Sequence, residues 1–250
     1  MSNLSKVFPL SASRPTLRLV PTNVKGCDAS CAVAQLGVTA LDAPAALNLH
    51  PHKSSLQLWK EKTGDISRPL SCTETKTNDE TSAAYWNMLL EPLIAAVYTK
   101  RTGRRLRRVE VFQAHKTIPW MLASVKWKLM DTPRPELFEC LSVSRDDVAS
   151  WSEGVPVHLR WSITHMLAVT GAHAVDIAVL LGGAELRIFR MERDDELIEM
   201  LIEKETAFWR SVVTCEALPD HLNPGDPGRM NVPSSSPPVL GHARSARLAT

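Results

Sequence analysis

The sequence predicts an α/β fold, in which helices flank a central mixed β-sheet. Amphipathic helical patterns alternate along the chain with short runs of alternating hydrophobic residues, and glycines or capping residues separate them. The chain has 250 residues, of which 44% are hydrophobic and 22% are charged. This composition is typical of a globular protein that buries a sizeable core, and it excludes disorder throughout.

The sequence also indicates where the protein resides. No run approaches the ~18 apolar residues of a membrane helix, and the basic N-terminal region lacks an apolar signal core. The five cysteines are scattered and odd in number, which fits reduced thiols better than a disulfide framework. We therefore expect a cytoplasmic protein that does not associate with membranes.

The chain divides into three parts. All seven tryptophans fall between Trp59 and Trp209, which places the packed domain at residues 34–215. Residues 1–33 are expected to form a flexible arm. Residues 216–250 hold six of the 17 prolines and no aromatic residue, so they are expected to form a disordered tail.

Helices and strands alternate within the packed domain. Helical periodicity, beginning at capping residues and ending before glycines, covers residues 54–64, 79–103, 156–171 and 194–212. Strand patterns cover residues 105–113, 120–128, 136–143, 174–181 and 185–191. The Gly182-Gly183 turn predicts a hairpin between the last two strands. Pro92 interrupts the second helix, so that helix must kink or restart there.

The most unusual local composition is a cationic run. Residues 100–108 contain six cations and no acid, although the net charge of the whole chain is only +2. A solvated face is one explanation, but contact with nucleic-acid phosphates accounts better for cations without acids. The predicted DNA-binding residues are Lys100, Arg101, Arg104, Arg105, Arg107 and Arg108.

Five stretches carry a family resemblance. They are PAALNLHPHKSSLQLWKEKTG (44–64), YWNMLLEPLIAAVYTKRTGRRLRRV (85–109), PWMLASVKW (119–127), ELFECLS (136–142) and THMLAVTGAHAVDIAVLLGG (164–183). In these stretches the chain resembles the YqaJ-type viral recombinases, relatives of lambda exonuclease with the PD-(D/E)XK nuclease fold. The resemblance implies a mixed sheet flanked by helices. It also implies Mg²⁺-dependent exonucleolytic trimming of linear double-stranded DNA during phage recombination, in a bacterial host cell.

The resemblance also implies which residues form the nuclease centre. The family takes a Glu from the helix before the sheet, which matches Glu91, and an Asp from the next strand, where this chain has Lys126. The following strand reads ECK in the family but ECL here, so Glu139 is kept and Leu141 replaces the Lys. Only Glu91 and Glu139 remain as candidate Mg²⁺ ligands. Because an ammonium replaces a carboxylate where a dication should bind, we expect impaired metal binding.

Alternatives remain open for these residues. Lys126 could pair with Glu139 or with Glu91 and so take over the electrostatic role of the missing ion. In a rescue arrangement, Lys126 would instead replace the lost lysine, and Asp131 or Glu136 would supply the missing carboxylate. Glu91 could also simply be an acid that favours the helix dipole.

Three functional hypotheses follow from the resemblance. The first is a phage or prophage recombination protein that binds double-stranded DNA ends with an impaired nuclease centre. The second is an active Mg²⁺-dependent exonuclease with relocated catalytic residues, and the third is a non-catalytic partner-binding or inhibitory protein. The implied partners are double-stranded DNA, further copies of the chain in a ring trimer, an active paralogue in a mixed oligomer, and a single-strand annealing protein.

Overall fold

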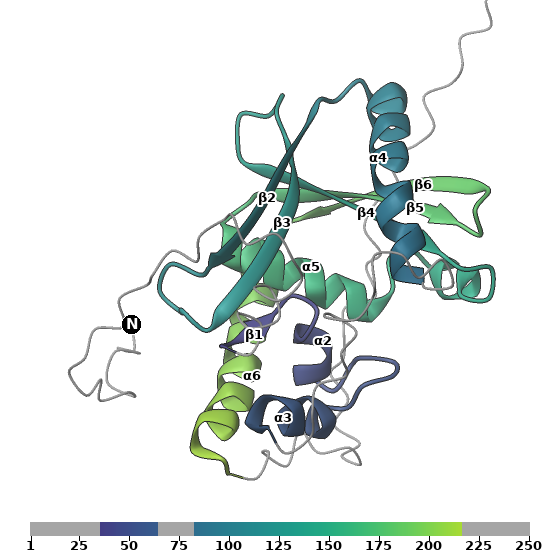
Figure 1. Cartoon of the computed structure of the whole chain (residues 1–250). Coiled ribbons are helices and arrows are strands. Elements are labelled where there is room, and N and C mark those ends of the chain that lie inside the picture. Colours follow the sequence, from purple (N-terminus) through teal and green to yellow (C-terminus); the bar gives the residue numbers. More distant parts are fainter. Residues whose placement is uncertain (1–35, 65–82, 217–250) are drawn as a thin grey trace, which may run out of the picture.

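The computed structural model describes residues 36–64 and 83–216, and it confirms the predicted α/β fold (Figure 1). The predicted arm, almost all of the predicted tail and the predicted helix start at Asp79 lie outside the described residues. The elements, in chain order, are β1 (Val38–Thr39), α2 (Ala43–Ala46), α3 (Ser55–Thr63), α4 (Ala83–Thr102), β2 (Leu106–Ala114), β3 (Met121–Leu129), β4 (Glu136–Val143), a 3-10 helix (Val148–Trp151), α5 (Val157–Thr170), β5 (Ala174–Leu181), β6 (Glu185–Glu192) and α6 (Asp195–Thr214).

The helices begin and end where their capping residues predict. The Ser54 hydroxyl accepts a hydrogen bond of 3.1 Å from the Gln57 amide at the start of α3, and Gly64 ends this helix with φ of 83°. The Asp194 carboxylate accepts hydrogen bonds from the amides of Glu196 and Leu197 at the start of α6. The ends of β2 to β6 lie within one residue of the predicted strands.

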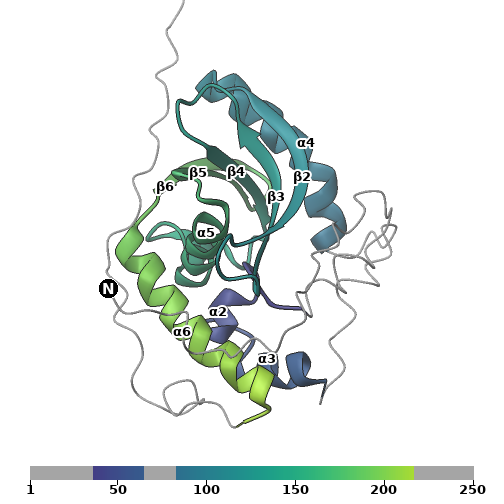
Figure 2. The same ribbon diagram turned by 90° about the vertical axis from the view of Figure 1, so that its left-hand side faces the viewer.

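The sheet is mixed. The path of paired strands is β1-β3-β4-β5-β6. Strand β2 lies off this path and pairs with β3 along most of its length. The β4–β5 pair and the short β1–β3 pair are parallel, whereas the remaining pairs are antiparallel. Helix α5 lies on one side of this sheet and α4 on the other (Figure 2).

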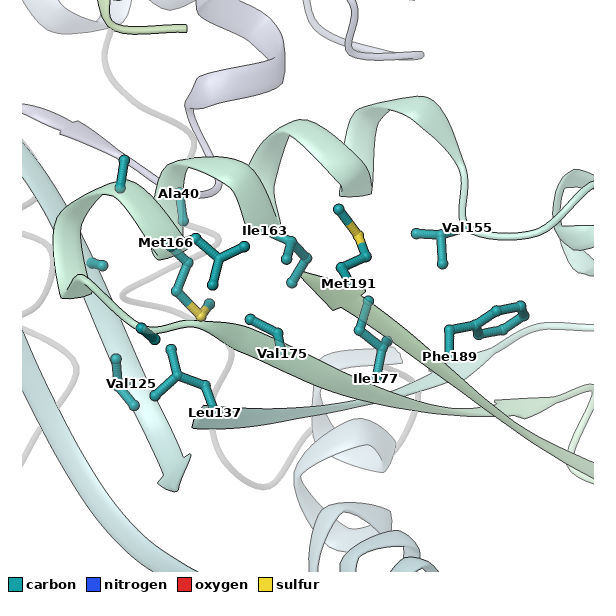
Figure 3. Packing of buried hydrophobic residues seen from close by; sticks show 14 of the residues in the cluster. Ala40, Val125, Leu137, Val155, Ile163, Met166, Val175, Ile177, Phe189 and Met191 are labelled. Carbon is teal, nitrogen blue, oxygen red and sulfur yellow. The ribbon is translucent and has the colours of Figure 1, made fainter. Parts of the chain in front are cut away.

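The main hydrophobic core lies between α5 and the sheet. Ile163 and Met166 of α5 face Val175 and Ile177 of β5, and all four are buried (Figure 3). The alternating residues of β5 point to this face because successive side chains of a strand point to opposite sides. A second cluster, built around Leu58, Leu201 and Phe208, joins β1, α2, α3 and α6 to Trp161 of α5. Within the two described ranges, none of the helices combines the length and hydrophobicity needed to cross a membrane.

Helix α4 packs on the opposite face of the sheet through Ile94, Ala95 and Tyr98. The helix continues through Pro92 and does not restart there. Proline lacks an amide hydrogen, so the carbonyl of Met88 loses its usual donor. Met88 and Pro92 are both exposed, and water can therefore solvate this carbonyl.

A network of paired charges ties α4 to the sheet. The buried Asp176 carboxylate of β5 accepts hydrogen bonds from the Tyr98 hydroxyl and the Arg104 guanidinium. Arg104 also bonds to Glu136 at 2.6 Å, and Arg190 of β6 bonds to both Glu136 and Asp176. Two guanidiniums therefore neutralise two carboxylates in a site that offers little water.

A second buried pair joins α5 to α6. The Nδ1 atom of His165 lies 2.8 Å from Oε1 of Glu205, and both side chains are fully buried. The Nε2–H of His165 donates to the Leu122 carbonyl at 3.0 Å. Burial alone would lower the pKa of His165, but the Glu205 charge and these hydrogen bonds outweigh it and raise the pKa.

We predict that replacing His165 by Ala lowers the free energy of unfolding by about 3–5 kcal/mol, because it leaves the Glu205 carboxyl buried without a partner. The pKa of His165 is raised above its ordinary value of 6.5, so the pair's contribution is complete below pH 6.5 and declines as pH rises through the folded-state pKa. Urea unfolding across this pH range measures both effects.

The double variant His165→Leu, Glu205→Met is the control. It removes both partners, so it should lose less stability than His165→Ala. An equal or larger loss in the double variant, or a wild-type stability that rises with pH above 6.5 relative to this double variant, would contradict this account.

Candidate active site and nucleic-acid interface

The candidate site lies where strands β3 and β4 separate. Only two residue pairs join these strands, Trp127 with Phe138 and Lys128 with Leu137. Lys126 and Glu139 are the next residues on the two strands. From there on β3 and β4 no longer pair with each other, and only their pairing with β1, β2 and β5 continues. We call this point the strand fork. It brings together two residues that are 13 positions apart in the chain.

Helix α4 places Glu91 at the strand fork. Glu91 is 6% exposed, and its Oε2 accepts a hydrogen bond of 2.8 Å from the Lys126 ammonium. Its Oε1 accepts a second hydrogen bond of 2.8 Å from the indole N–H of Trp127. Both carboxylate oxygens of Glu91 are therefore engaged by side chains of β3.

Further contacts fix α4 over β4. One turn before Glu91, the Asn87 side-chain oxygen accepts a hydrogen bond of 3.2 Å from the Ser142 amide. The Cys140 thiol lies 3.8 Å from the Glu91 carbonyl oxygen. Burial raises the pKa of the Cys140 thiol to about 12, so this thiol stays protonated and does not act as a nucleophile.

The three ionisable groups of the strand fork influence one another. Burial favours a protonated Glu91, but the hydrogen bonds from Lys126 and Trp127 outweigh it and lower the pKa of Glu91. Burial also disfavours the charged Lys126, but Glu91 and the more distant Glu139 raise the pKa of Lys126. Burial raises the pKa of Glu139 to about 7, and the charge of Lys126 only partly offsets this. The fork therefore holds one ion pair and one carboxyl that is partly protonated near neutral pH.

This donor set does not fit Mg²⁺. A hard dication takes oxygen ligands, usually several of them charged, yet the Glu91 oxygens already accept from an ammonium and an indole. Among the described residues, no three His, Cys, Asp or Glu side chains are grouped as a metal site. The Lys126 ammonium would also repel a dication directly.

The structure does not support the rescue arrangement. Asp131, beyond the end of β3, forms an ion pair of 2.6 Å with Arg105. Glu136, at the first residue of β4, is held by Arg104 and Arg190. Neither carboxylate reaches the strand fork. Leu141 packs against the main hydrophobic core and offers no polar group.

The cationic run separates into residues with different roles. Arg104 is part of the buried network with Asp176 and Glu136, so two carboxylates already balance its charge. Arg105 pairs with Asp131 on the surface. Arg108 pairs with Glu110, and its guanidinium lies 5.8 Å from the centre of the Trp127 ring.

The remaining cations of the run are less engaged by acids. Arg101 donates a hydrogen bond of 2.9 Å to the Leu186 carbonyl. Lys100 is exposed at the end of α4. Arg107 is exposed on β2, directly opposite Lys128 of β3.

Sequence reasoning missed three contributors. Trp127 gave no separate signal in the sequence, although its N–H holds Glu91. Asp176 within the apolar strand AVDIAVLL could have been noticed, because a lone acid in a buried strand requires partners. Lys128 gave no signal in the sequence, since its position opposite Arg107 depends on the strand register.

Comparisons with known proteins agree with the family resemblance. Residues 32–173 match the model of the YqaJ-like viral recombinase domain. The chain is 31% identical over 180 residues to the uncharacterized protein YqaJ of Bacillus subtilis (strain 168), a match that covers 71% of this chain and 53% of that protein. The chain thus spans about half the length of this curated relative.

Two solved structures share the fold. The alkaline exonuclease LHK-Exo of Laribacter hongkongensis aligns with a TM-score of 0.59 and 21% identity, over 75% of this chain and 93% of that chain. The same enzyme in complex with dAMP aligns with a TM-score of 0.58 and 22% identity, over 73% and 91%. The family match, the curated relative and this shared fold all agree, and the chain belongs to the YqaJ-like viral recombinase domain family.

Proposed function

We propose that this chain is a phage-type DNA recombination protein that binds the ends of linear double-stranded DNA and whose own nuclease centre is impaired. The ion pair between Lys126 and Glu91 carries this proposal. It lies at the strand fork, where the family pattern has an Asp in place of Lys126. The proposed location is the cytoplasm of a bacterial host.

The charges at the strand fork support an impaired centre. Hydrolysis of a phosphodiester by this family's chemistry needs carboxylates around a dication, which activates water and stabilises the developing charge. Here Lys126 neutralises Glu91, and burial raises the pKa of Glu139 to about 7, which favours its protonated form. Both effects reduce the carboxylate charge that is available to a dication.

The names of the relatives support the nucleic-acid part of the proposal. The family description refers to viral recombinases, and the structural neighbour LHK-Exo is an alkaline exonuclease whose complex contains dAMP. The side chain of Lys126 is 52% exposed, so a DNA phosphate can approach its ammonium group. Such a contact would need no metal and would be independent of sequence.

The other two functional hypotheses differ in how well they agree with the structure. An active exonuclease with relocated residues is less compatible with the geometry, because Asp131 and Glu136 are both held by arginines. A partner-binding role has one observation in its favour, which is that Leu89 and Leu93 of α4 are 46% and 61% exposed. Further copies of this chain, an active paralogue or a single-strand annealing protein are the proposed partners.

We predict that the purified protein does not degrade end-labelled linear duplex DNA with Mg²⁺ or Mn²⁺. The variant Lys126→Asp, Leu141→Lys restores the missing carboxylate and lysine, so it should degrade the same DNA at least ~100-fold faster, a factor that single active-site groups commonly contribute. Gel electrophoresis of the labelled products measures this.

The matched control is Lys126→Asn, Leu141→Lys, which removes the ammonium without adding a carboxylate. It should remain inactive. Metal-dependent degradation by the unmodified protein, abolished by Glu91→Gln, would contradict the proposal.

We predict a second, independent signature of the ion pair. In the unmodified protein the Glu139 carboxyl should titrate near pH 7, because burial raises its pKa to about 7. In Lys126→Met the pKa of Glu139 should rise further, since the ammonium that favours its ionised form is removed. Carbon NMR of labelled glutamate side chains, assigned with Glu139→Gln, measures these midpoints.

The control for this titration is Lys128→Met, which removes an equal charge two residues away. It should shift the Glu139 midpoint less than Lys126→Met does. A midpoint close to that of a solvated glutamate, in the unmodified protein, would show that the strand fork is open to water and would argue against the proposed pairing.

A further inference from the structure

The antiparallel ribbon of β2 and β3 carries two cations directly opposite each other. The strand register pairs Arg107 with Lys128. Side chains at such opposed positions point to the same face, with Cβ atoms about 5 Å apart. Arg107 is exposed and Lys128 is half-buried. We call these two residues the cationic pair.

Among the residues that the structure describes, no acid compensates the cationic pair. Within the described part of the chain, neither Arg107 nor Lys128 forms an ion pair, although their neighbours do. Arg105 is bound by Asp131, and Arg108 is bound by Glu110. The ribbon therefore neutralises the cations on either side of Arg107 but leaves the opposed pair without a carboxylate.

This arrangement does not benefit the fold. Like charges directly opposite each other destabilise an antiparallel pair, and an acid at either position would instead form a favourable cross-strand pair. In the buried networks of this protein, in contrast, the closely spaced charges are balanced. The cationic pair therefore favours binding of an anion that the described residues do not supply.

We propose that Arg107 and Lys128 bind backbone phosphates of duplex DNA. This inference rests on the proposed function, and it assigns that function to one face of one ribbon. Lys126 lies two residues from Lys128 on the same strand, which is about 7 Å at the usual rise of a strand. A DNA strand bound by the cationic pair is thus adjacent to the Lys126 ammonium at the strand fork.

Duplex DNA suits this surface for two reasons. It presents one negative charge per ~1.7 Å of helix axis, so closely spaced cations meet phosphates in every register. The Arg107 guanidinium can also donate two parallel hydrogen bonds to one phosphate, which fixes the geometry of the contact. The hydrogen-bonded ribbon holds both cations in place before DNA arrives.

The test measures binding of the full chain to a labelled linear duplex by fluorescence anisotropy, in EDTA and over a series of salt concentrations. In Arg107→Gln, Lys128→Gln the affinity at ~0.1 M salt should fall at least tenfold, and the slope of log affinity against log salt should lessen by about two. The charge-conserving exchange Arg107→Lys, Lys128→Arg should bind within about threefold of the unmodified protein.

The matched control is Lys204→Gln, Arg210→Gln, which removes two cations from α6 and should leave the slope nearly unchanged. The melting temperature gives a second readout. It should stay constant or rise in Arg107→Gln, Lys128→Gln, because a repulsion is removed, whereas residues needed for the fold would lower it.

The outcomes separate this inference from the proposed function. If the unmodified protein binds duplex DNA but the Arg107→Gln, Lys128→Gln variant binds as tightly as the α6 control, the cationic pair is not the DNA site, and the proposed function still stands. If the unmodified protein does not bind duplex DNA at any salt concentration, both fail. If the cationic pair is needed for binding polyglutamate but not DNA, the surface belongs to an acidic protein partner and the inference is overturned.

Discussion

A buried charge must be paired, and this requirement determines how the helices are attached to the sheet. Arg104 and Arg190 hold Asp176 and Glu136 between α4 and the strands β4, β5 and β6. His165 and Glu205 join α5 to α6 on the other side. Removing one member of such a pair leaves an uncompensated charge in a poorly solvated site, so each pair constrains the positions of the elements that supply it.

The same requirement shapes the strand fork. The Glu91 side chain projects from α4 into a site with little access to water, so both of its oxygens need hydrogen-bond donors. In this chain Lys126 and Trp127 supply them. Leu141, in contrast, needs no partner and packs into the apolar core. The fork is therefore satisfied by the side chains themselves, and this internal neutrality is the physical basis of the proposed loss of nuclease activity.

Much of the fold could be predicted from the sequence, because it depends on local signals. Ser54 and Gly64 mark the ends of a helix, and alternating residues mark the strands. The candidate site was predictable only in part. The pairing of Lys126 with Glu91 was one of two alternatives, whereas the role of Arg104 depends on Asp176, which lies 72 positions away. A cationic run in the sequence does not reveal which members meet distant acids after folding.

We propose that the Lys126 ammonium takes the electrostatic role of a metal ion at the strand fork. The most direct measurement is a titration of the unmodified protein with Mn²⁺, followed by the electron paramagnetic resonance signal of the free ion. We expect this signal to grow in proportion to added Mn²⁺, as it does in buffer, and we expect Lys126→Asp to remove free ion from solution. Saturable binding of Mn²⁺ by the unmodified protein, lost in Glu91→Gln and in Glu139→Gln, would show instead that a metal ion still binds at the strand fork.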